Sequence, residues 1–197
     1  MTAAGKMERM SEAEYLAWEA EQAGKHEWLN GEIVAMSGAR ALHNLLVANL
    51  VRALQRGLDG RPCDVLGSDQ RVMVADSTMY AYPDLMVVCG QPVLSPTDRM
   101  SLTNPTVVVE VLSPSTEAHD RGAKFAHYRQ LPSLQAYVLV STELDRVEVF
   151  ERDGAEWRFR EAGASVRLDC LSLTLSMAEV YWRADLYRAA EAEAAAE

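Results

Sequence analysis

The chain has 197 residues, of which 49% are hydrophobic, so it is long enough for one domain with a sizeable core and too apolar for global disorder. Its formal net charge of -10 argues against a tight, non-specific nucleic-acid binder, because phosphate contacts need clustered lysine and arginine. A nuclease stays open, because a local basic groove or bound cations can offset the mean charge.

The terminal sequence, the apolar runs and the cysteines argue against a secreted, membrane-spanning or zinc-binding protein. The N-terminal stretch lacks an apolar signal-peptide core, and no apolar run approaches the ~18 residues that span a bilayer. Cys63, Cys89 and Cys170 lie far apart, and an odd number without a C-x-x-C pair indicates neither a zinc site nor a disulfide framework. We therefore expect three buried, reduced thiols in a cytoplasmic protein without membrane attachment.

The first elements in chain order are a helix, a hairpin and a second helix. Residues 1–10 read as a loose leader, and residues 11–24 as a capped helix. Asn30-Gly31 between two mixed apolar runs predicts a hairpin, because both turn positions need a positive φ. Leucines at helical spacing over residues 42–58 predict a core helix that packs on a sheet.

Strands are expected in the middle of the chain. Residues 64–75 read as a strand, a turn follows at Asp76-Ser77-Thr78, and another strand covers residues 83–89. Residues 90–105 contain several prolines and read as a surface loop. The β-branched run 106–112 predicts a short central strand.

The remaining elements complete a single α/β or α+β domain. The run 113–116 ends the central strand and can cap a helix that extends to about Gln130. A final helix begins at Ser176, and we expect one domain over residues 11–188 with a frayed Ala/Glu-rich helical tail over residues 189–197. Further strands are expected at 136–141, 146–151, 157–160 and 171–175, the last of which closes the sheet.

Two acids, Asp84 and Glu110, interrupt apolar runs that otherwise read as buried strands. Charged side chains are rarely buried unless they are paired or bind something. If the two strands are neighbours, both carboxylates can converge on one cation, and hard oxygen ligands suit Mg²⁺ or Mn²⁺. Lys124, on the helix that follows Glu110, could supply a further charge or orient a water. The sequence thus favours a divalent-metal site that acts on phosphodiesters.

Each candidate residue also has a purely structural explanation. Glu110 could form an ion pair with a lysine or arginine, and Asp120 with Lys124 could be an exposed i,i+4 helix pair. Glu32 could reach the site as a third acid or cover the exposed side of the hairpin. His43 could contact phosphate or the site, or pack at a helix start.

Four arginines around the late strands are a further candidate. Arg146, Arg152, Arg158 and Arg160 could form a basic strip for a nucleic-acid backbone. A solvated sheet face with alternating charge explains them better.

In its motifs, the chain resembles the Uma2 family, also called DUF820, of the PD-(D/E)XK restriction-endonuclease-like superfamily. The resemblance covers roughly residues 11–185. The matching elements are the hairpin with Asn30-Gly31-Glu32, then His43, Pro83-Asp84, the run Glu110-Val111-Leu112-Ser113-Pro114-Ser115-Thr116, and Asp120-x-x-x-Lys124 with Tyr128.

The resemblance implies a mixed central sheet flanked by helices and a Mg²⁺-dependent, nuclease-type site. By position, Asp84 and Glu110 correspond to the metal-binding acids, and the backbone carbonyl of Val111 to a further ligand. The superfamily's lysine normally lies two residues after the second acid, where this chain has Leu112. In the Uma2-like pattern the lysine has moved to the helix, as Lys124.

Two function hypotheses follow. The first is a metal-dependent endonuclease that cuts DNA, with Glu32 and His43 as further catalytic candidates, and that forms a homodimer because two-fold proteins mirror two-fold sites. The second is a catalytically inactive nuclease-fold module for dimerisation or regulation, favoured by Leu112 and by the acidic mean charge. An RNA-processing or nucleotide-hydrolysing enzyme would use the same metal site.

Overall fold

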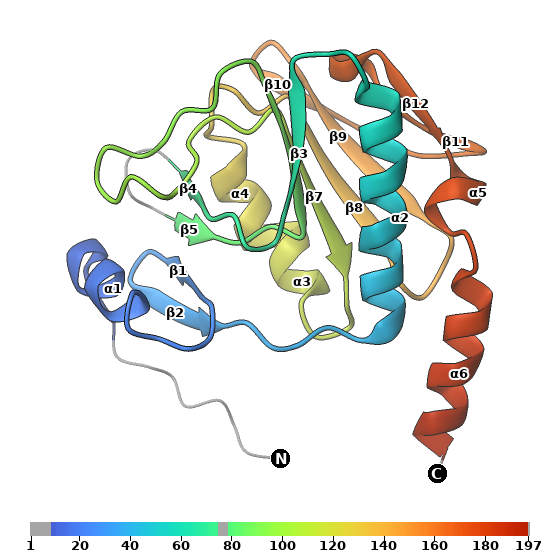
Figure 1. Cartoon of the computed structure of the whole chain (residues 1–197), viewed down its shortest axis with the longest axis horizontal. Helices are drawn as coiled ribbons and strands as arrows, with labels where there is room; N and C mark the ends of the chain where they lie inside the picture. The colour runs from blue at the N-terminus through green and yellow to red at the C-terminus, as the bar shows by residue number, and fades with distance from the viewer. Residues whose placement is uncertain (1–8, 75–78, 197) are drawn as a thin grey trace.

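The computed structural model describes residues 9–74 and 79–196, which form sheets and covering helices (Figure 1). The helical elements are α1 (Glu12–Glu19), α2 (Ala41–Leu58), α3 (Glu117–His119), a π-helical turn (Asp120–Lys124), α4 (Phe125–Tyr128), a 3-10 turn (Asp169–Leu171), α5 (Met177–Val180) and α6 (Ala184–Ala196). The strands are β1 (His26–Leu29), β2 (Glu32–Ala35), β3 (Cys63–Gly67), β4 (Val72–Val74), β5 (Met79–Ala81), β6 (Leu85–Cys89), β7 (Val107–Leu112), β8 (Ala136–Ser141), β9 (Val147–Asp153), β10 (Glu156–Glu161), β11 (Ser165–Leu168) and β12 (Leu173–Ser176).

The central sheet has the strand order β10-β9-β8-β7-β6-β3. It is mixed, because β7 and β8 are parallel whereas the other neighbours are antiparallel. A parallel pair needs a crossover, which α3, the π-helical turn and α4 supply. All six residues of β7 are buried, as its apolar run predicts for a central strand. The predicted mixed sheet flanked by helices is confirmed.

Two cores lie on opposite faces of this sheet. The leucines of α2 pack on the face that carries Val109 and Val111, together with α5 and the β11–β12 pair. The other face carries Val108 and Leu112, and it packs on α4 and on a four-stranded sheet of order β2-β1-β5-β4. Because side chains alternate along a strand, Glu110 belongs to this second face.

The hairpin prediction is confirmed, whereas two strand predictions are wrong. Asn30 and Gly31 have φ values of 47° and 93°, as the turn between β1 and β2 requires. Residues 64–75 do not form one strand, because turn-forming residues after Gly67 separate β3 in the central sheet from β4 in the four-stranded sheet. Residues 171–175 do not close the central sheet, because β12 pairs with β11 alone. The turn predicted at residues 76–78 lies outside the described residues.

A buried arginine ties the loop between β6 and β7 to the four-stranded sheet. Arg71, which directly precedes β4, donates to Ser101 Oγ at 2.8 Å and pairs with Asp98 at 2.7 Å. Burial raises the pKa of Asp98, but its hydrogen bonds with Ser101, Met100 and Arg71 outweigh this effect and lower the pKa overall.

Asp98→Asn should lower the free energy of unfolding by about 1–3 kcal/mol at neutral pH, because Arg71 loses a charged hydrogen-bond partner. The folded-state pKa of Asp98 lies below its unfolded value. Its contribution is therefore present above the unfolded pKa and is lost as the pH falls through the folded pKa. Urea unfolding of both proteins across this range should show the difference shrinking on acidification. A difference in unfolding free energy that stays the same at every pH would contradict an ionised Asp98 as the partner of Arg71.

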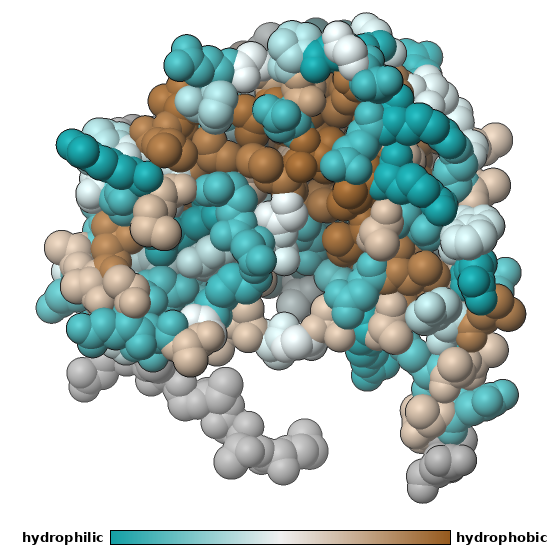
Figure 2. Space-filling view, in the orientation of Figure 1, coloured by the Kyte–Doolittle hydropathy of each residue, from teal (hydrophilic) through white to brown (hydrophobic). Residues whose placement is uncertain are grey.

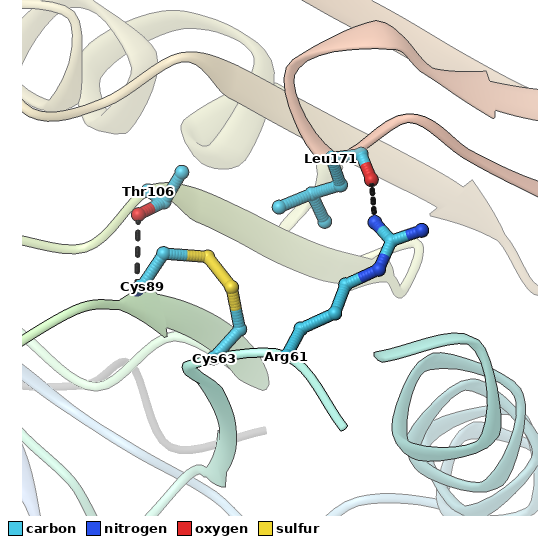
Figure 3. The surroundings of a disulfide bond; sticks show 5 residues. All are labelled: Arg61, Cys63, Cys89, Thr106 and Leu171. Atoms are coloured by element: carbon cyan, nitrogen blue, oxygen red, sulfur yellow. Dashed lines mark hydrogen bonds between the residues drawn. A yellow bond between two sulfur atoms is a disulfide. The ribbon is translucent and has the colours of Figure 1, made fainter. Parts of the chain in front are cut away.

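A disulfide joins Cys63 and Cys89, which are directly paired between β3 and β6 (Figure 3). The Cys89 N–H also donates to Thr106 Oγ1 at 3.2 Å. Cys170 is a free and exposed cysteine. The prediction of three buried, reduced thiols is therefore wrong, because the spacing of two distant cysteines does not reveal that their strands are neighbours. The cysteines therefore give no support for a cytoplasmic location.

Removing this disulfide should lower the free energy of unfolding by about 3 kcal/mol, because the bond restrains a long loop in the unfolded chain. Urea unfolding of the Cys63→Ala/Cys89→Ala variant against the oxidised protein measures the change. Cys170→Ala is the matched control, since its thiol is free. Equal losses in the two variants would show that the disulfide contributes nothing specific.

The C-terminal segment belongs to the fold. Residues 189–196 continue α6, and Glu191 accepts a hydrogen bond from the Leu42 N–H of α2 at 2.9 Å. The predicted tail is therefore helical through Ala196, whereas its fraying and the domain bounds stay predictions. Across residues 9–74 and 79–196, every helix is too short or too polar to span a bilayer.

Exposed large apolar side chains lie on several elements, among them Leu186 of α6. Figure 2 shows a hydrophobic band across the upper half of one face of the molecule, above a largely hydrophilic lower left. The exposed apolar residues of the β6–β7 loop are Val93, Leu94 and Met100. None of these three lines the pocket described below.

Candidate active site

Asp84, directly before β6, lies opposite Glu110 of the neighbouring antiparallel strand β7. Leu85 of β6 pairs with Val109 of β7, which sets Asp84 against Glu110. The Asp84 N–H donates to Glu110 Oε2 at 3.3 Å, and the Val111 N–H donates to Asp84 Oδ2 at 2.8 Å. The two carboxyl groups therefore converge on the same face of the sheet, as the sequence predicts.

The Lys124 ammonium is buried among three carboxylates. Its Nζ lies 2.9 Å from Glu27 Oε1, 3.1 Å from Glu110 Oε1 and 3.4 Å from Asp120 Oδ1. No side chain of these four is more than 6% exposed. The explanation of Asp120 and Lys124 as a solvent-exposed helix pair is therefore wrong. The ion pair of Glu110 with Lys124 exists, but one ammonium cannot neutralise three acids.

The segment between α3 and α4 places Lys124 at the sheet. Residues Asp120–Lys124 form a π-helical turn, a widened turn that is frequent at functional sites. The Tyr128 hydroxyl lies 3.5 Å from Glu110 Oε1, and the Tyr137 hydroxyl donates to the Asp120 backbone carbonyl at 2.9 Å. Both tyrosines are buried, and each contacts one acidic residue of the cluster.

Burial and the neighbouring charges shift the pKa values of side chains in the cluster. Burial raises the pKa of Glu110 well above its ordinary value despite the nearby lysine, and it raises the pKa of Asp120 in the same way. Burial lowers the pKa of Lys124, but the charges of Glu110, Glu27 and Asp120 outweigh this and raise the pKa. The cluster is thus short of positive charge, and a further cation would relieve the surplus of acid groups.

His43 meets this site from the first turn of α2. Its Nε2 lies 3.2 Å from Asp84 Oδ2, and its Nδ1 is buried without a hydrogen-bond partner in the described part of the chain. Burial lowers the pKa of His43, but the hydrogen bond to Asp84 and the charge of that carboxylate outweigh this and raise it. The structure therefore brings His43 to Asp84, as the sequence suggests.

Glu32 does not reach the cluster. Its side chain is 49% exposed and lies 3.5 Å from Arg9. Glu27, inside β1 and 4% exposed, occupies the position of the third acid instead. The structure thus corrects the prediction for Glu32, because the hairpin turns this residue to the surface. An acid directly beside Trp28 and Leu29 in a short strand was the signal that sequence reasoning missed.

The cluster lies in a pocket of about 640 Å³. Its walls include residues 34–40 before α2, the segment 113–116 after β7, and the turn at 142–143 between β8 and β9. α6 contributes Arg188 and Glu191, two lining residues that the sequence analysis assigned to no site.

The four arginines of the late strands bind partners within the chain. Arg146, Arg158 and Arg160 contact carboxylates, and Arg152 donates to backbone carbonyls. The structure therefore favours a face of alternating charge over a basic strip.

The residues present fit a hard divalent cation with an incomplete protein shell. Within the described residues, no three His, Cys, Asp or Glu side chains form a ligand set for a metal. A cation could use the carboxylates of Asp84 and Glu110, with the Val111 carbonyl and waters completing its coordination. Mg²⁺ suits such a shell, because it dehydrates reluctantly and usually binds through one or two carboxylates.

The mixed sheet, with a crossover helix after its acid-bearing central strand, is a restriction-endonuclease-like fold. The model of the Uma2 family, described as "Putative restriction endonuclease", matches residues 12–180, so this chain belongs to the Uma2 family. The resemblance found in the motifs is confirmed.

Two proteins of Synechocystis sp. are similar to the chain over most of its length. Uncharacterized protein slr1290 is 39% identical over 174 residues, which cover 86% of this chain and 89% of that protein. Uncharacterized protein sll1609 is 38% identical over 153 residues, which cover 77% of this chain and 86% of that protein.

A crystal structure from Anabaena variabilis, described as a "putative nuclease belonging to DUF820", has the same fold. It superposes with a TM-score of 0.73 at 16% identity and covers 89% of this chain and 99% of that one.

Proposed function

We propose that this protein is a nuclease that hydrolyses phosphodiester bonds of DNA with the help of Mg²⁺ or Mn²⁺. One observation carries the proposal: four carboxyl groups share a pocket with one buried ammonium, that of Lys124. Surplus buried acid groups are costly unless a cation binds them. The four carboxyl groups are those of Glu27, Asp84, Glu110 and Asp120.

Each residue has a distinct part in this proposal. Asp84 and Glu110 offer oxygens to the ion, and the Val111 N–H keeps Asp84 turned toward the site while its carbonyl is a further ligand. Lys124 contacts Glu110 and orients that carboxylate, and His43 orients Asp84 through Nε2, so both are positioning residues. When bound, the ion would acidify a water and stabilise the charge of the phosphate.

The reaction adds water across one ester bond. A water oxygen bonds to phosphorus and loses a proton, while the ester bond to the departing oxygen breaks and that oxygen gains a proton. Incubation of supercoiled plasmid and of single-stranded DNA with the protein tests the proposal. Cleavage of at least one of the two DNAs is expected with Mg²⁺ or Mn²⁺ and not with chelator. Absence of product from both DNAs with either ion would contradict the proposal.

A non-catalytic nuclease-fold module is the second candidate. Leu112 in the usual lysine position and the complete burial of Lys124 among acids favour it. Titration calorimetry separates the two candidates, because a folded protein that binds no divalent metal near neutral pH would be the module. The predicted homodimer and cytoplasmic location are further proposals, for sedimentation and cell fractionation to check.

A further inference from the structure

The acids of the candidate site lie deep in a walled pocket. The Glu110 side chain is 4% exposed, and Asp84 with its partner His43 is 17% and 13% exposed. A scissile phosphate must therefore enter the pocket to approach these acids. The volume of about 640 Å³ lies in the range of small-ligand sites, roughly 300–1,000 Å³. A pocket of this size can take one or two unpaired nucleotides. A phosphate of a duplex is linked to a base-paired nucleotide, so the second strand would have to enter with it.

α6 closes one side of this pocket. Glu191 accepts the hydrogen bond from Leu42 N–H at 2.9 Å, which ties α6 to the start of α2. Arg188 donates to the Thr142 carbonyl at 3.0 Å and pairs with Asp145 at 2.7 Å, which ties α6 to the β8–β9 turn. A helix can enter the major groove of a duplex, but Asp185 and Glu193 are exposed on α6, and the phosphates of a duplex would repel these two acids.

The cationic side chains that line the pocket can neutralise only a few phosphates. Duplex DNA carries one negative charge per ~1.7 Å of axis, and binding it takes many free cations. Of the two arginines that line the pocket, Arg188 is already paired with Asp145. Arg40, the residue before α2, lines the pocket, is exposed and forms no ion pair with any residue in the described ranges. It is therefore placed to contact one phosphate beside the scissile one.

We propose that the site accepts an unpaired strand, either single-stranded DNA or a single-stranded end or flap, and excludes the backbone of an intact duplex. The proposal rests on the nuclease function proposed above. The walls formed by α6 and residues 34–40 set the selectivity, and Arg40 positions the strand.

Three labelled DNA substrates of one sequence test the proposal: a single strand, a blunt duplex, and a duplex with a single-stranded flap. With Mn²⁺, the single strand and the flap should be cut at least about tenfold faster than the blunt duplex. Equal cutting of the blunt duplex would overturn the selectivity and leave the nuclease function standing. No cutting of any of the three would overturn the nuclease function itself.

Arg40→Glu tests the positioning of the strand, with Arg129→Glu as the matched control on an exposed arginine that does not line the pocket. Arg40→Glu should raise KM for the single strand about tenfold with kcat little changed, because the charge acts on binding. Arg129→Glu should leave both values near those of the wild type. Equal KM in the two variants would overturn the role of Arg40.

Discussion

Asp84→Asn is expected to reduce metal-dependent cleavage of DNA by at least about a hundredfold, since even one lost donor to a developing charge costs that much in other hydrolases. Asparagine has nearly the same shape and still accepts the hydrogen bond from the Val111 N–H, so the fold should persist. The substitution removes the negative charge that faces the cation site beside Glu110. Initial rates of cleavage of single-stranded DNA with Mn²⁺ measure the effect.

Asp64→Asn is the control for this experiment. Asp64 is an exposed aspartate of β3, outside the candidate pocket, and its replacement makes the same change in charge. Its variant should cut at the wild-type rate. If Asp84→Asn cuts as fast as Asp64→Asn, Asp84 holds no catalytic cation and the site assignment is wrong.

Lys124→Met is expected to destabilise the fold by about 3–5 kcal/mol near neutral pH, because it leaves buried carboxylates without their counter-charge. The affected acids are Glu27, Glu110 and Asp120. Acidification should shrink the loss, because protonated carboxyl groups need no partner. Urea unfolding monitored by tryptophan fluorescence at several pH values measures both effects.

Lys25→Met provides the comparison for Lys124→Met. Lys25 pairs with Asp69, which is fully exposed, so the same substitution should destabilise the fold much less than Lys124→Met does. If both variants lose the same free energy, the cluster around Lys124 is not a strained, charge-rich centre. In that case Lys124 would be an ordinary ion-pair partner.

The sequence predicted the strands that carry the site, because an acid inside an apolar run stands out. Glu110 within β7 and Asp84 before β6 have this signature, and their convergence needed only that the strands be neighbours. Glu27 was missed, because one acid in a four-residue strand next to a turn looks like surface. Its burial depends on the fold of the π-helical turn, which places Lys124 opposite.

Long-range pairings account for the other differences. The disulfide of Cys63 with Cys89 follows from the antiparallel register of β3 and β6, which spacing along the chain does not encode. The part of α6 in the pocket depends on contacts between residues far apart in the sequence, from Leu42 N–H to Glu191 and from Arg188 to the Thr142 carbonyl. Local patterns therefore predicted most of the helices and strands and the site residues Asp84, Glu110 and Lys124. The positions of Glu27 and α6 depend on tertiary packing.

A structure determined with Mn²⁺ tests the central claim most directly, because anomalous scattering locates the ion without assumptions about its ligands. We predict one peak about 2.0–2.2 Å from oxygens of both Asp84 and Glu110, with the Val111 carbonyl beside it. A fully loaded protein whose ion lies elsewhere, or crystals in Mn²⁺ without a peak between these two carboxylates, would contradict the claim.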